Sequence, residues 1–169
     1  MIHPDITRER RSADTVRLTG CSVRGPKHER DEIPCQDAWC GYDLPDSRFV
    51  IAVGDGLGSA DHSDRGSQCA TQTAANELKS TVESSDDIAP AELEAPMKAA
   101  FVAARRRVEA EAREMGVPVS ALHTTLLAVV GGQSGVAAAA VGDGGIVGHR
   151  DGKPLLLVPC EDTEYGNVT

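Results

Sequence analysis

The stretch FVIAVGDGLGSADHSDRGSQCA, residues 49–70, decides how we expect this chain to fold. The apolar, β-branched run at 48–53 predicts a buried strand, and the small and apolar residues from position 64 onward have the spacing of a helix. Between them stands Gly54-Asp55-Gly56. The two glycines let backbone atoms closely approach whatever the Asp55 carboxylate binds. This junction therefore favours a hard metal ion such as Mg²⁺ or Mn²⁺.

Length and charge limit the classes of function that the chain can serve. Its 169 residues suit one domain, which we expect to span residues 15–169 after a charged N-terminal arm at 1–14. The formal charge of −9, with two Phe, two Tyr and one Trp, argues against a nucleic-acid partner, which needs a basic surface and stacking aromatics. No apolar run reaches the ~20 residues of a membrane helix, and the N-terminus has no hydrophobic signal region. We therefore expect a cytoplasmic protein without a membrane partner.

The cysteines carry no structural signature. The chain has five of them, an odd number, and none forms a C-x-x-C pair. This usage supports neither a disulfide framework nor a zinc ribbon, so we expect ordinary reduced thiols.

Periodicity and turn residues predict strands, then two long helices, then strands. Strands are expected at 15–23, 36–42 and 48–53, with a polar loop at 24–32; helices at 64–80 and 90–115; and further strands at 124–130, 136–141, 146–149 and 154–158. Consecutive strands at hairpin distance indicate antiparallel pairing. This order is typical of an α+β fold in which helices cover paired sheets.

Three aspartates occupy similar positions in the sequence. Asp55 and Asp143 each follow an apolar strand and each lie between glycines, while Asp37 stands at the start of another expected strand. The carboxylates would converge if their strands were neighbours, and such a cluster of hard oxygen ligands suits Mg²⁺ or Mn²⁺. Asp-Gly pairs are also common in simple hairpin turns. The alternative for any one of these aspartates is therefore that it only forms a turn and binds no metal.

A glycine-rich loop between a strand and a helix is also found in nucleotide sites. VIAVGDGLG, residues 50–58, partly matches the loop of Rossmann-type S-adenosylmethionine-dependent methyltransferases. Against that alternative, Asp55 would stand where the loop needs neutral amides, and Ala52 occupies the place where such loops usually carry an acid.

Five segments in order resemble one family. They are SVRGPKHERDEIPCQDAW (22–39), VIAVGDGLGSADHSDRGS (50–67), HTTLLAVV (123–130), VGDGGIV (141–147) and EYGNVT (164–169). Together they resemble the metal-dependent protein phosphatases of type 2C, particularly their compact bacterial branch, from about residue 19 to residue 169. The resemblance implies an antiparallel β-sandwich flanked by helix pairs, a four-layer αββα arrangement, with a two-metal centre at one end of the sheets.

The resemblance also implies roles for particular residues. Asp55 would bridge two Mn²⁺ or Mg²⁺ ions and Gly56 would lend its carbonyl, Asp37 would support a metal through water, and Asp143 would serve a third metal. The family holds phosphate with an arginine before the first acid, for which Arg24, His28 and Arg30 are candidates. A metal-activated water would then attack phosphorus, with no side-chain nucleophile.

Two departures from the family pattern bear on activity. Leu57 stands where well-studied eukaryotic members have a histidine, and we expect the nearby His62 to be a loop or helix-cap residue. The family's later metal-binding aspartates would fall after Thr169, so the chain is expected to be C-terminally incomplete, corresponding to the N-terminal two-thirds of the fold. The leading hypothesis is a serine/threonine phosphatase acting on phosphoserine or phosphothreonine proteins. The alternative is a non-catalytic regulatory or binding module with the same fold.

Overall fold

The computed structural model describes residues 16–85 and 89–159. In chain order its elements are α1 (Pro26–Arg30), β1 (Ala38–Leu44), β2 (Arg48–Gly54), α2 (Ser63–Glu83), the 3₁₀ turn η1 (Pro90–Leu93), α3 (Glu94–Met115), the 3₁₀ turn η2 (Val119–Leu122), β3 (Leu126–Gly132), β4 (Gly135–Val141), β5 (Ile146–Arg150) and β6 (Lys153–Val158). Among the helices described, none combines the length and apolar character that crossing a membrane requires.

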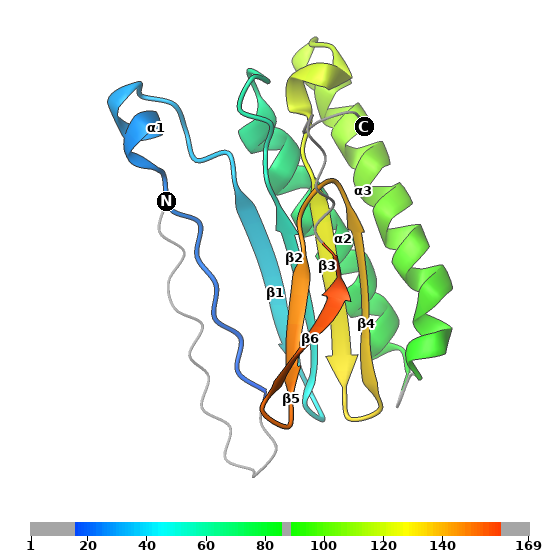
Figure 1. The fold of residues 1–169 in the computed structure, drawn as a ribbon. Helices are drawn as coiled ribbons and strands as arrows, with labels where there is room; N and C mark the ends of the chain where they lie inside the picture. The colour runs from blue at the N-terminus through cyan, green and yellow to red at the C-terminus, as the bar shows by residue number, and fades with distance from the viewer. Residues whose placement is uncertain (1–15, 86–88, 160–169) are drawn as a thin grey trace.

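The main sheet has four strands in the order β1-β2-β3-β4, and every neighbouring pair is antiparallel (Figure 1). Alternation in β2 decides which face becomes core: Val50 and Ala52 are 0% exposed, whereas Val53 is 43% exposed. A Rossmann-type methyltransferase needs a parallel sheet with crossover helices, so this antiparallel order contradicts that alternative.

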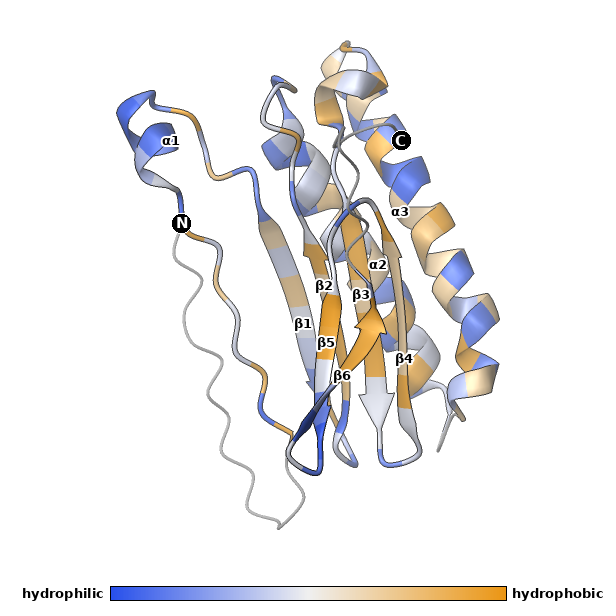
Figure 2. Cartoon of the chain, viewed as in Figure 1, coloured by the Kyte–Doolittle hydropathy of each residue, from blue (hydrophilic) through white to orange (hydrophobic). Residues whose placement is uncertain are grey.

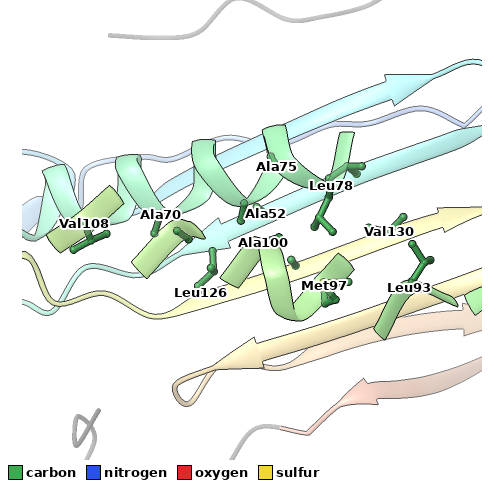
Figure 3. Close-up of a cluster of buried hydrophobic side chains, with 14 of the residues drawn as sticks. Ala52, Ala70, Ala75, Leu78, Leu93, Met97, Ala100, Val108, Leu126 and Val130 are labelled. Atoms are coloured by element: carbon green, nitrogen blue, oxygen red, sulfur yellow. The ribbon is translucent and has the colours of Figure 1, made fainter. Parts of the chain in front are cut away.

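Helices α2 and α3 cover one face of the sheet and enclose the main core (Figure 1). Small side chains such as Ala74 and Ala100, both 0% exposed, let the two helices lie close together and close to the strands. Leucine, valine and methionine side chains fill the rest of the core (Figure 3). Helix α3 ends at Gly116, whose φ of 70° is the left-handed conformation that glycine adopts most easily.

The two-stranded sheet β5-β6 lies over the other face of the main sheet (Figure 1). Its hydrophobic side chains Val147, Leu155 and Leu156 are 42% to 67% exposed, and the hairpin is strongly apolar near the middle of β6 (Figure 2). The expected α+β class with antiparallel sheets and covering helices is confirmed. Of the four layers expected in an αββα arrangement, the described residues form three: the helix pair α2–α3, the main sheet and the β5-β6 sheet.

The expected strand at 15–23 is wrong for the part that the structure describes, since residues 16–25 form no ladder. They pass along the outer side of β1, where Gly20 lies so close to the Trp39 ring that a Cβ would come within 2.7 Å of it. The expected loop at 24–32 contains the short helix α1, because Pro26 at its first position supplies the φ that starts a helix. The expected arm at 1–14 lies outside the described residues.

Candidate metal centre

Asp37 and Asp55 face each other at one end of the main sheet. The β1–β2 ladder ends with Ala38 opposite Gly54, so the next residue on each strand is one of these aspartates. The backbone connection continues beyond them, because the Gly56 N–H donates to the Gln36 carbonyl at 3.1 Å. The register of two hydrogen-bonded strands therefore brings two carboxylates together on one edge, and both are exposed to solvent.

Partial burial and acidic neighbours together disfavour the charged form of Asp55. The pKa of Asp55 is raised above its ordinary value of 3.8, first by partial desolvation and then by hydrogen bonding to the Asp37 carboxyl group and by the negative charges of Asp37 and Asp143. The neighbouring negative charges that disfavour ionisation of Asp55 would favour a bound cation, which offsets them.

Asp143 reaches the same end of the sheet from β4. Its strand is not a direct neighbour of the strand that carries Asp55, because β3 lies between β2 and β4. The β3–β4 ladder ends with Leu126 opposite Val141, and Gly142 then leaves strand geometry with a φ of 102°. Asp143 follows this bend, close enough for its charge to act on Asp55.

The loop from Asp55 to α2 is fixed by backbone hydrogen bonds. The Leu57 N–H donates to the His123 carbonyl and the His62 N–H to the Ala121 carbonyl, both at 2.9 Å. The Ser67 hydroxyl, on the first turns of α2, donates to the Gln36 carbonyl at 2.6 Å. His62 is the N-cap residue of α2, as expected, although its side chain makes no capping bond. The loop is therefore a rigid link between the aspartate and the helix.

The three phosphate-binding candidates lie beside the end of the sheet where β1 begins (Figure 1). Arg24 is exposed just before α1, and His28 and Arg30 belong to that helix. The Arg30 guanidinium is 71% exposed and pairs with its neighbour Asp31 at 3.1 Å. Their role in holding phosphate stays a prediction.

The carboxylates fit a hydrated divalent ion better than a closed protein cage. Among residues 16–85 and 89–159, no three His, Cys, Asp or Glu side chains are arranged closely enough to hold a metal ion. Mg²⁺ and Mn²⁺ are hard ions, and Mg²⁺ commonly keeps several waters while bound by one or two carboxylates. Asp37 and Asp55 supply that number at one exposed edge, beside an open groove of about 340 Å³ that Asp37 and Trp39 line.

A comparison with known families agrees with these observations. The family model described as Protein phosphatase 2C matches residues 24–169. The chain belongs to the protein phosphatase 2C family. It is also 30% identical over 162 residues to serine/threonine-protein phosphatase 3 of Escherichia coli strain K12, and the match covers 90% of this chain. The chain spans 61% of that relative's length.

This member of the protein phosphatase 2C family contains two site residues that the sequence patterns did not single out. Thr124 and Thr125 precede β3 and both hydrogen-bond to the backbone of Asp55. A signal was present, since two adjacent hydroxyl residues at the start of a buried strand are suited to bonding neighbouring backbone. The partner could not be read from the pattern, because Asp55 is about 70 positions away.

Proposed function

We propose that this protein is a metal-dependent serine/threonine phosphatase that hydrolyses phosphate monoesters on protein substrates. The observation that supports it most is the opposed pair of Asp37 and Asp55 at the end of the main sheet, with the pKa of Asp55 raised by burial and by its acidic neighbours. Membership of the protein phosphatase 2C family supports the same activity.

In this proposal Asp55 is the principal ligand of Mn²⁺ or Mg²⁺, with Gly56 contributing its carbonyl, Asp37 acting through water and Asp143 serving a further ion. When bound, the metal ions supply an activated water and offset the charge that develops on the phosphoryl group. The chain's own contribution is orientation, since the hydrogen bonds on both sides of Asp55 hold its backbone before any ion arrives. Leu57 has no proton to donate, so this position does not protonate the leaving group.

The substrate class follows from the same proposal. Phosphoserine and phosphothreonine side chains extend from a protein surface and can reach the exposed carboxylates. Arg24, His28 and Arg30 are the residues we propose for holding the phosphate group. The cytoplasmic location expected from the sequence remains a prediction.

Turnover of p-nitrophenyl phosphate with Mn²⁺ tests the proposal directly. Asp55→Asn keeps the size of the side chain but removes the charge, so we expect it to lower turnover at least about 100-fold, the scale on which a main electrostatic group acts. Asp151→Asn is the matched control, because Asp151 is an exposed residue in the β5–β6 turn with φ 53°, a conformation that asparagine also tolerates.

Two results would count against the proposal. Equal turnover by the Asp55→Asn and Asp151→Asn variants would show that the Asp55 carboxylate is not needed for hydrolysis. Mn²⁺ binding that depends on Asp55 but comes with no turnover would favour the alternative of a non-catalytic module. That alternative has one observation in its favour, the lack of three grouped ligand side chains among the residues that the structure describes.

A further inference from the structure

Thr125 occupies the position between the two strand ends that carry Asp55 and Asp143. The β2–β3 ladder has Val53 opposite Leu127, and continuing its register places Asp55 opposite Thr125. The β3–β4 ladder has Leu126 opposite Val141, which places Gly142 opposite Thr125 on its other side. Thr125, 9% exposed, therefore lies between Asp55 on one side and Gly142, the residue before Asp143, on the other.

The hydroxyl and the methyl group of Thr125 contact different strand ends. Its Oγ1 accepts the Asp55 N–H at 3.0 Å, in place of a backbone carbonyl, and its own N–H donates to the Asp55 carbonyl at 2.8 Å. Its methyl group lies against Gly142, where a Cβ would come within 2.5 Å of Cγ2. The hydroxyl thus bonds one strand end, and the methyl group packs against the other.

Thr124 also hydrogen-bonds to the backbone of Asp55. Its hydroxyl lies 3.0 Å from the Asp55 carbonyl and 2.9 Å from the Thr125 carbonyl, and its single hydrogen is shared between these acceptors. Gly56 pairs with Thr124 as an isolated antiparallel bridge, so the contact continues one residue past Asp55. The N–H and C=O of Asp55 are both engaged by Thr124 and Thr125, the two residues before β3, so the Asp55 side chain is the part left to face Asp37.

We propose that Thr125, assisted by Thr124, is a positioning residue that fixes the backbone of Asp55 at the metal centre. This inference rests on the proposed function, because it concerns the same site. Groups that orient a metal ligand typically change metal affinity by about 10–100-fold when they are removed. Thr125 acts on the backbone of Asp55, through its hydroxyl and its own N–H.

Mn²⁺ affinity measured by titration calorimetry tests the proposal. Thr125→Val keeps the shape and the methyl contact with Gly142 but loses the hydroxyl, and should weaken Mn²⁺ binding by about 10–100-fold. Thr125→Ser restores the hydroxyl and should bind within about threefold of wild type. Thr71→Val is the control, because the buried Thr71 hydroxyl bonds only to carbonyls of its own helix, at 2.8 Å and 3.3 Å. It should lose stability without losing Mn²⁺ affinity.

Amide hydrogen exchange at Asp55 gives a readout that needs no metal. Thr125→Val should speed exchange of this amide by about tenfold or more, and Thr125→Ser should leave it protected. Any one of three results would overturn the positioning role. The first is wild-type Mn²⁺ affinity in Thr125→Val, and the second is Mn²⁺ binding as weak in Thr125→Ser as in Thr125→Val. The third is an unchanged exchange rate of the Asp55 amide in Thr125→Val. Failure of the wild-type chain to bind Mn²⁺ would instead count against the proposed function, and the exchange result would still decide the role of Thr125.

Discussion

Replacing Gly56 with alanine tests whether the junction beside Asp55 tolerates any side chain. A Cβ at Gly56 would lie 2.6 Å from the Gln36 carbonyl oxygen, 2.8 Å from the Ser63 oxygen and 2.9 Å from the Ser63 carbonyl carbon, whereas ordinary contacts are 3.4–4 Å. All three atoms belong to backbone, so none can rotate away. Overpacking of this kind costs about 1–3 kcal/mol, and weakening the Gly56 N–H bond to Gln36 adds about 1 kcal/mol.

The expected loss for Gly56→Ala is therefore about 2–4 kcal/mol of unfolding free energy, or roughly 5–15 °C in Tm for a chain of this size. Urea unfolding followed by fluorescence measures it, because Trp39 is the only tryptophan and lies two residues from Asp37. Gly58→Ala is the matched control, since its Cβ would meet only the Gln36 side-chain oxygen at 3.9 Å. Losses that agree within about 0.5 kcal/mol for the two variants would refute the steric argument.

Two further predictions concern contacts outside the site. Glu111→Gln should lower Tm by about 2–4 °C, because the Glu111 side chain is 5% exposed and binds Arg65 and Arg107. Hydrogen bonding to Arg65 is the largest cause lowering the Glu111 pKa below 4.5, so the stabilisation by Glu111 should fade as pH falls through that lowered pKa. A difference in Tm from wild type that stays constant down to pH 2 would contradict this prediction. Arg48→Met should destabilise the fold by about 1.5–3 kcal/mol in urea unfolding, because the Arg48 guanidinium donates to the Val82 carbonyl at 2.7 Å near the end of α2. Arg105→Met is the control, because the Arg105 side chain is exposed.

The strongly patterned elements were predictable because each carries its own signal. The β-branched run in β2 and the alanine-rich helix α3 need no distant partner to be recognised, and both were predicted within a few residues. The expected strand at 15–23 failed because a strand also needs a neighbour to bond with, and Thr19 to Val23 find none among the described residues. Alternation in sequence predicts an extended chain but does not supply its partner.

The site was predictable in its residues but not in its arrangement. Glycines on both sides of Asp55 and Asp143 identify strand ends where a ligand can approach. That Asp37 stands directly opposite Asp55 depends on the register of β1 against β2, which the turn at 45–47 and the burial of alternate residues together decide. The insertion of β3 between β2 and β4 depends on the long connection through α2 and α3, and no local pattern encodes it.

The metal centre also has to be stabilised by the rest of the fold. Two opposed carboxylates repel each other, and desolvation together with these neighbouring charges raises the pKa of Asp55. The Ser67 hydroxyl, which donates to the Gln36 carbonyl, joins this edge to α2. Thr124 and Thr125, which bond to the Asp55 backbone, join it to the central strand β3, whose Ala128 is 1% exposed in the core. An unfavourable cluster can therefore keep a fixed geometry because neighbouring buried elements hold it, which is how a preorganised ion site differs from a flexible acidic loop.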